Sequence, residues 1–277
     1  MSYSKNILWL VILLTTICTS SLQAQKKEYS QYLFNQYLSK GIDLELGLPV
    51  SVQDIKYLAN SNPTLVTVTS NGYATYELLS MAETGVHIIL EEYKKKNEKL
   101  NQFDYEKLIK ACPNNLTIEY HGFPVDLEEA VRNNINLRIV KNLSENRLRK
   151  LVKSNPDLFT IVSENNPRNL SEYLKLGARV EVNHKMKIYP LEGLIKRGKN
   201  SVRITCDKYT YSELRKFIDL GAEVVIGKPL SRKEITKLVQ SNPHNVRVDL
   251  TYYTMKEIQA IAKYGLKKLK YNTNIRK

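Results

Sequence analysis

Cysteines and long apolar segments are both scarce in this sequence. Only three of the 277 residues are cysteines, and one of them, Cys18, lies in an N-terminal segment that we expect to be removed. The other two, Cys112 and Cys206, cannot form the disulfide framework typical of small exported domains. The one strongly apolar run, residues 7–14, is shorter than the roughly 20 residues that a membrane-spanning helix needs. The mature chain is therefore predicted to have no transmembrane segment.

Residues 1–24 have the order of a secretory signal peptide. Lys5 precedes the apolar run, and small or polar residues up to Ala24 follow it. We expect cleavage near Ala24 and export to the periplasm, the cell envelope or the outside of the cell. Lipidation at Cys18 is disfavoured because a bulky Ile17 stands before it.

Catalytic and metal-binding signatures are also missing. The sequence has no phosphate-binding Gly-rich loop, no H-E-x-x-H and no G-x-S-x-G. Two of its four histidines, His121 and His184, fall several predicted units apart and cannot share a metal ion. We therefore expect no metal site and no cofactor. An enzyme is disfavoured but not excluded.

Positive charge is plentiful. The chain carries 42 lysines and arginines against 28 acidic residues, a formal net charge of +14. Such an excess favours anionic partners. The expected partner is a protein or an anionic polymer, such as a glycan or another envelope component. Nucleic acid fits the charge but is the less favoured partner.

A repeat of about 22 residues is the strongest signal in the sequence. Ten predicted strands place an aliphatic residue at one position and a second one two residues later. The first row is Leu44, Val66, Ile88, Leu116, Leu137, Phe159, Val180, Val202, Val224 and Val246. Short amphipathic helices separate these strands, and several begin with a capping box such as Thr210 with Glu213. We expect a capping helix in 25–41, the repeats in 42–265 and a basic cap or tail in 266–277.

The predicted strands alternate between apolar and polar residues, which indicates one face packed on helices and one face in water. We interpret this as an α/β fold of about ten strand–helix units in an open parallel solenoid. The alternative is a closed β/α barrel. It is disfavoured because residues such as Arg138 and Arg203 would then point into the interior, where unpaired charge is costly.

Two of the predicted strands match the motif L-x-L-x-x-N, in which two aliphatic residues are followed by an asparagine. They are Val66-x-Val68 with Asn71, and Leu137-x-Ile139 with Asn142. On these residues the architecture resembles that of leucine-rich-repeat proteins. The resemblance covers residues 42–265, although most units lack the asparagine. It implies that the polar sheet face is a binding surface.

Candidate functional residues gather at the strand ends and on the polar face. Glu164, His184 and Asp207 follow successive strands and are the candidates for acid–base chemistry. The candidates for binding are Glu119, Arg138, Glu181, Arg203, Arg247, Asp249, Lys185, Tyr209 and Tyr252. The competing interpretation is structural, because opposite charges on neighbouring strands, such as Glu181 and Arg203, stabilise a sheet by pairing.

The favoured function is a non-enzymatic exported module that binds a protein or polymer partner through the exposed sheet face. A second hypothesis is an envelope-glycan hydrolase or transferase with its site at the strand ends. A third is attachment to anionic surfaces through C-terminal cations, namely Lys267, Lys268, Lys270, Arg276 and Lys277.

Overall fold

A computed structural model describes residues 31–91, 100–122, 125–141, 143–163, 169–205, 207–228 and 230–271. The expected leader lies outside these ranges, as do Glu164, Cys206, Arg276 and Lys277. The chain divides into residues 1–31 and a compact unit from Tyr32 to Lys277. The description below concerns the second unit.

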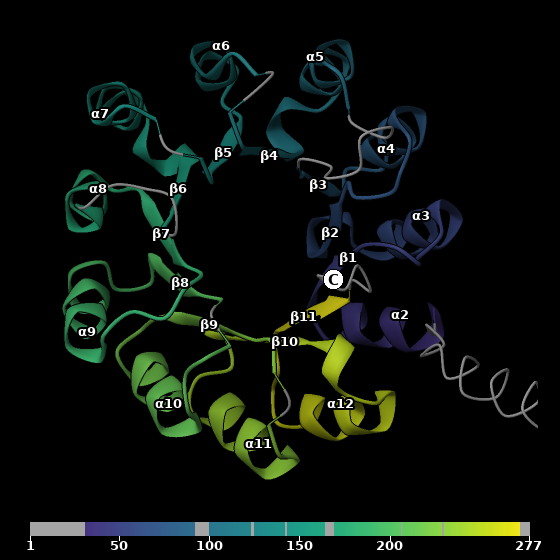
Figure 1. Ribbon diagram of the computed structural model, residues 1–277. Coiled ribbons are helices and arrows are strands. Elements are labelled where there is room, and N and C mark those ends of the chain that lie inside the picture. Colours follow the sequence, from purple (N-terminus) through teal and green to yellow (C-terminus); the bar gives the residue numbers. More distant parts are fainter. Residues whose placement is uncertain are drawn as a thin grey trace, which may run out of the picture. The chain divides into compact units, whose positions relative to one another are not determined.

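The described residues form eleven parallel strands, which make the inner ring in Figure 1. They are β1 (Asp43–Leu46), β2 (Val66–Thr69), β3 (His87–Leu90), β4 (Leu116–Tyr120), β5 (Asn136–Ile139), β6 (Phe159–Val162), β7 (Arg179–Val182), β8 (Val202–Ile204), β9 (Glu223–Ile226), β10 (Val246–Asp249) and β11 (Lys268–Tyr271). The first ten contain the predicted aliphatic row.

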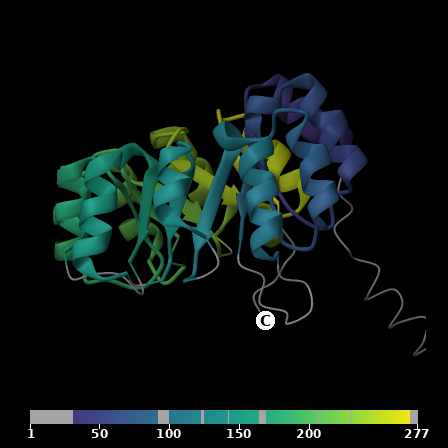
Figure 2. The same ribbon diagram turned by 90° about the horizontal axis from the view of Figure 1, so that it is seen from above.

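A helix lies between each pair of consecutive strands, and one more helix precedes the first strand. The helices lie outside the ring of strands in Figure 1, and Figure 2 shows the same elements turned by 90°. The helices are α2 (Gln31–Ser39), α3 (Val52–Ser61), α4 (Thr75–Ala82), α5 (Gln102–Ala111), α6 (Leu127–Arg132), α7 (Glu145–Ser154), α8 (Leu170–Leu176), α9 (Ile188–Arg197), α10 (Tyr211–Asp219), α11 (Arg232–Ser241) and α12 (Met255–Ala262). Four 3₁₀ turns, Pro63–Leu65, Pro113–Asn115, Pro156–Leu158 and Leu250–Tyr252, complete the described elements.

Helix starts follow the sequence signals. The predicted capping boxes at Thr210, Ser231 and Thr254 all form, and each hydroxyl accepts a hydrogen bond from a backbone amide three residues later. Such caps satisfy backbone donors that a helix cannot pair internally.

The core lies between the strands and the helices. Residues of the aliphatic row, such as Val66, Ile88 and Leu116, are completely buried there. Burying one such side chain contributes about 1.5–3 kcal/mol. The predicted packed face is therefore confirmed.

The sheet closes on itself, which corrects the open solenoid. β11 pairs with β10, where Arg247 faces Lys268, and also with β1, where Glu45 faces Lys270. The α/β class and the parallel pairing are confirmed, but the closed barrel that was the disfavoured alternative is the actual architecture. The resemblance to leucine-rich-repeat proteins was also wrong, because the sheet closes into a barrel. The strand that closes it, β11, lies within residues 266–277, which were expected to form a cap or tail.

The barrel is wide enough to hold charged side chains. Where β1 pairs with β2, Leu44 lies opposite Val66. Where β2 pairs with β3, Val68 instead of Val66 lies opposite Ile88, so the register shifts by two residues between β2 and β3. Four further strand pairs advance in the same way, which gives a shear of 10. Eleven strands with this shear have a radius of about 10 Å, against about 7 Å for an eight-stranded barrel. The wider interior explains why the charge argument against closure failed.

Candidate active site at the carboxyl ends of the strands

Ion pairs cover a large part of the inner face of the barrel. The Arg138 guanidinium contacts Glu119 and donates from Nε to Glu181 Oε2 at 3.0 Å. Glu181 faces Arg203 in the sheet, as predicted, and accepts a further hydrogen bond from the Thr205 hydroxyl at 3.2 Å. Burial opposes ionisation of Glu181, but Arg138 and Arg203 outweigh it and lower its pKa.

A second group of ion pairs surrounds Glu223 on β9. Its carboxylate lies 2.9 Å from Lys268 Nζ, 3.3 Å from Arg203 Nη2 and 3.4 Å from Arg247 Nε. Burial alone would raise the pKa of Glu223, but these three cations lower it to about 2. The side chain of Arg203 is still 38 % exposed, so water reaches this part of the inner face.

Glu45 on β1 joins the two ends of the sheet. It lies 2.9 Å from Arg247 Nη1 on β10 and 3.0 Å from Lys270 Nζ on β11. Burial opposes its ionisation, but Lys270 and Arg247 lower the pKa of Glu45 to about 2. Two of the cations expected in a basic tail, Lys268 and Lys270, therefore neutralise buried carboxylates inside the barrel.

This arrangement corrects the favoured function. The polar face lines the interior of a closed barrel, so it is not an exposed sheet face that could meet a large partner. Among the binding candidates, Arg138 pairs there with Glu119 and Glu181, whereas Arg203 and Arg247 both pair with Glu223. The non-enzymatic repeat module with an exposed sheet face was wrong, and so was the description of the chain as a solenoid.

Three tyrosines have structural positions after the strands. Tyr209 is fully buried, and its hydroxyl accepts from the Met186 amide at 2.8 Å. Tyr253 accepts from the Leu230 amide at 2.9 Å, and Tyr73 donates to the Val50 carbonyl at 2.6 Å. Each bond joins a loop to the preceding unit, 23 residues earlier.

The remaining binding candidates lie around these loops. Lys185 Nζ lies 4.2 Å from the centre of the Tyr209 ring and 3.3 Å from Glu213. The Asp249 carboxylate accepts from the Thr251 amide at 2.9 Å, and Tyr252 is 45 % exposed. These contacts assign local structural roles to Lys185 and Asp249.

Ser163 and His184 meet at the carboxyl ends of β6 and β7. The Ser163 Oγ lies 2.9 Å from His184 Nδ1 and 3.4 Å from Asn183 Oδ1. Ser163 is only 6 % exposed and its amide donates to the Glu181 carbonyl at 2.8 Å, so its backbone is fixed by the sheet. A hydroxyl beside a neutral imidazole is the arrangement that activates serine as a nucleophile.

Ser70 occupies the equivalent position after β2 and shows what a purely structural serine does there. Its Oγ accepts from the Glu91 amide at 3.0 Å, much as Ser163 accepts from the Asn183 amide at 3.4 Å. Within the described ranges, no histidine ring forms a hydrogen bond with Ser70. The imidazole is what distinguishes Ser163.

A surface groove begins at this serine–histidine pair. It has a volume of about 600 Å³, and its lining includes Ser163, His184, Met186, Tyr189 and Gly193. Nothing lies within 4 Å of the place where a side chain would begin at Gly193, and Tyr189 is 87 % exposed. The pair therefore borders a groove that opens at the surface.

The acid–base candidates of the sequence are only partly brought together. His184 is in the groove, whereas Glu164 lies outside the described residues. Asp207 is exposed and has no hydrogen bond to His184 in the described part of the chain. Sequence reasoning missed Ser163, although its position directly after a buried strand and beside the strand of His184 could have indicated it.

The described ranges contain no group of three or more histidine, cysteine or acidic side chains that could hold a metal ion. Cys112 is buried with its Sγ 3.2 Å from the Leu108 carbonyl, and burial raises the pKa of this thiol. No helix in these ranges has the length and apolar character needed to cross a membrane.

Comparisons with known proteins leave the family open. No protein-family model matches the chain, and no curated protein matches it either. Among solved structures, an HpcH/HpaI aldolase from Desulfitobacterium hafniense DCB-2 is 12 % identical, with a TM-score of 0.34 over 86 % of this chain and 88 % of that chain. A similarity at this level identifies neither fold nor activity, and the barrel rests on the strand pairing itself.

Proposed function

We propose that this protein is a serine esterase, with Ser163 as the nucleophile and His184 as its general base. The observation that carries the proposal is the 2.9 Å distance between Ser163 Oγ and His184 Nδ1 at the carboxyl ends of two neighbouring barrel strands. Active sites of eight-stranded β/α barrels lie at the same end of the strands, because the loops there are free to vary on a rigid sheet. The proposal keeps the strand-end location predicted for His184.

The two side chains account for both halves of ester hydrolysis. Nδ1 of His184 takes the hydroxyl proton as Ser163 Oγ bonds to the carbonyl carbon. The bond to the leaving oxygen then breaks, and that oxygen takes the proton from His184. Water attacks the acyl-serine next and gives its proton to His184. Release of the carboxylic acid restores the Ser163 hydroxyl.

The groove suggests an acyl ester on a sugar as the substrate class. Leu170 and Met186 give it an apolar wall for an acyl chain, and Tyr189 offers a flat aromatic face at its edge. Exposed aromatic faces of this kind can pack against sugar rings. The predicted export would place such substrates in the cell envelope.

Turnover of p-nitrophenyl esters and of acetylated sugars by the full-length chain tests the proposal. Ser163→Ala and His184→Ala should each lower kcat/KM by at least about 100-fold, the size of a general acid–base contribution. Ser70→Ala is the matched control, because it removes the corresponding serine at a strand end without an imidazole. It should change stability but leave turnover within about twofold.

Two outcomes count against the esterase. One is full activity in a folded Ser163→Ala variant. The other is the absence of turnover across both substrate panels, with Ser163→Ala lowering only the free energy of unfolding, as Ser70→Ala does. The second result would assign Ser163 to the same structural role as Ser70.

A further inference from the structure

A cationic groove lies on the outer surface of the barrel, away from the serine–histidine pair. It has a volume of about 510 Å³ and is lined by Arg232, Lys233, Thr236, Lys237 and Gln240 of α11 and by Tyr264, which follows α12. Three of these six residues are cations and none is acidic. Tyr264 is 43 % exposed, so its ring borders an accessible surface.

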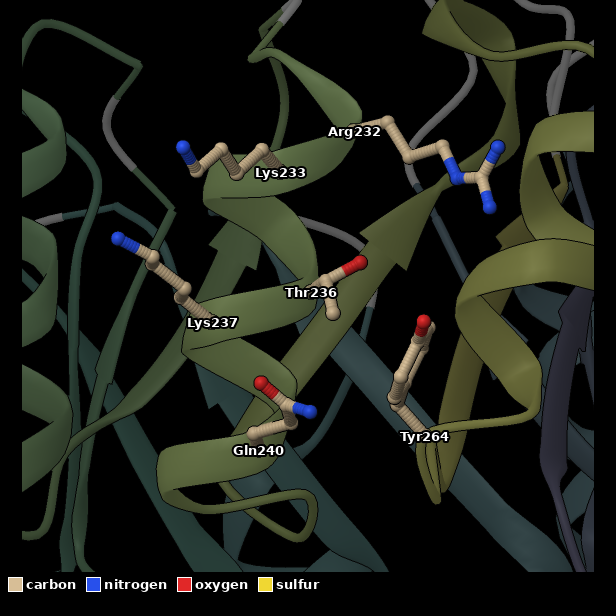
Figure 3. Close-up of a pocket in the computed structure, with 6 residues that line it drawn as sticks. All are labelled: Arg232, Lys233, Thr236, Lys237, Gln240 and Tyr264. Atoms are coloured by element: carbon tan, nitrogen blue, oxygen red, sulfur yellow. The ribbon is translucent and has the colours of Figure 1, made fainter.

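The lining residues form two sets on α11. Arg232, Thr236 and Gln240 follow one another at four-residue intervals, which places them along one side of the helix. Figure 3 shows Arg232 and Thr236 on the same side as Tyr264, with the tyrosine hydroxyl pointing toward them, whereas Lys233 and Lys237 project from the opposite side of α11. The helix therefore offers donors on one side and two ammonium groups on the other.

The cations of this groove are not neutralised by neighbouring helices. Elsewhere on the outer surface, cations pair with acids on adjoining helices: Arg147 with Glu128 at 2.8 Å, Arg149 with Glu172 at 2.5 Å and Lys216 with Glu192 at 2.5 Å. Over the described ranges, Arg232, Lys233 and Lys237 have no acidic partner within 4.0 Å. Glu234, the acid of α11, accepts instead from the amide and hydroxyl of Ser231.

The equivalent helix α7 carries four cations of its own, but an acid stands at its first position. Aligning Leu151–Val152 with Leu238–Val239 places Glu145 at the position of Arg232 and Lys150 at that of Lys237. Since the same scaffold accepts an acid in α7, folding does not require the first-turn arginine.

We propose that this groove binds a soluble ligand carrying several phosphate groups. The Arg232 guanidinium can hold phosphate oxygens through two parallel hydrogen bonds, and Thr236 and Tyr264 supply further hydroxyl donors. Lys233 and Lys237 project from the other side of α11 and add positive potential to the groove rather than direct hydrogen bonds. From Arg232 to Gln240 the helix rises about 12 Å, a span that accommodates more than one phosphate. The site does not depend on the esterase proposal.

Calorimetric titration of the full-length chain with inorganic tripolyphosphate at physiological salt tests this site. Saturable binding is expected, at least tenfold tighter than that of orthophosphate. Arg232→Ala should weaken it by about tenfold or more, the usual size for hydrogen bonds to charged groups. Lys237→Glu should weaken it by about threefold or more through the negative charge it places beside the groove. Lys150→Glu is the matched control, with the same charge change at the equivalent position of α7, and should stay within about twofold.

Three results overturn the proposal. Equal losses in Lys150→Glu and Lys237→Glu indicate attraction by net charge alone. Tighter binding of vesicles containing an anionic lipid, or of single-stranded DNA, with the same dependence on Arg232 assigns the surface to another class of partner. Orthophosphate binding as tight as tripolyphosphate binding removes the requirement for several phosphates. Thermal melting of each variant establishes that a loss of binding is not a loss of folding.

Discussion

Glu45 and Arg247 are 202 residues apart in the chain, yet the carboxylate of one lies 2.9 Å from the guanidinium of the other inside the barrel. Between them runs β11, whose Lys270 also contacts Glu45 at 3.0 Å. The ion pair thus spans the seam where the last strands meet the first. Closing the seam brings Glu45 to these two cations, whereas an open solenoid would have left the carboxylate at a sheet edge.

Stability is expected to fall in acid through the inner carboxylates. Glu45 and Glu223 have folded-state pKa values lowered to about 2 from about 4.5. A lowered pKa stabilises the fold fully above the unfolded value, and this contribution is lost as the pH falls from about 4.5 toward about 2. Urea unfolding at a series of pH values measures it. Glu45→Gln should flatten the dependence in this window, and an unchanged slope contradicts the account.

Removing Arg247 should destabilise the barrel by roughly 3 kcal/mol, because Glu45 and Glu223 would lose a buried partner. Arg215 on α10 is the control, since it is exposed and lies 3.9 Å from Asp219. Arg215→Ala should change the free energy of unfolding by no more than about 0.5 kcal/mol. Equal losses of the free energy of unfolding in the two variants, measured by urea unfolding, would show that the inner ion pairs stabilise the fold no more than a surface ion pair does.

Two adjacent tyrosines, Tyr252 and Tyr253, allow the effect of a hydrogen-bonded structural hydroxyl to be compared with that of an exposed one. Tyr253 is buried, accepts from the Leu230 amide and donates to the Lys228 carbonyl at 2.7 Å, whereas Tyr252 is 45 % exposed. Tyr253→Phe should cost about 1–2 kcal/mol because two part-buried backbone groups lose their partner. Tyr252→Phe should be close to neutral. A neutral Tyr253→Phe in thermal melts would remove the role assigned to the loop tyrosines.

Substitutions at Gly193 in α9 can test helix stability and access to the groove independently. A methyl group there meets nothing within 4 Å, so Gly193→Ala should stabilise the helix by up to about 1 kcal/mol. Gly193→Phe places a large ring at the groove and should slow hydrolysis of long acyl esters more than that of acetates. Kinetics on a series of acyl lengths measures the difference. An equal effect on all lengths argues against this groove as the acyl site.

Local features of the fold were predictable because they depend on residues close in sequence. The aliphatic pairs such as Val66 and Val68 identified the strands, and Thr210 with Glu213 identified a helix start. Closure was not predictable in this way, because it depends on the pairing of Lys268–Tyr271 with both β10 and β1. That segment alternates like the other strands, with Leu269 and Tyr271 buried, but its lysines made it resemble a basic tail, and only the closed barrel shows that they pair with Glu45 and Glu223.

The candidate site was partly predictable. His184 was identified from its place after a strand, but Ser163 was not, since only the alignment of β6 and β7 brings its hydroxyl to the imidazole. Asp207, chosen by the same strand-end rule, is exposed instead. The position of a residue along its strand therefore predicts at which end of the barrel it lies, but not which side chains come together there.

The most direct test of the central claim is covalent labelling with a fluorophosphonate, a reagent that reacts with activated serines. Intact-mass and peptide mass spectrometry of the full-length chain should find one adduct, on Ser163. His184→Ala should slow its formation at least about 100-fold, whereas Ser70→Ala should leave the rate unchanged. Labelling of Ser163 that is equally fast without His184, or no adduct at Ser163 in the folded protein, would contradict the assignment of this pair as the catalytic site.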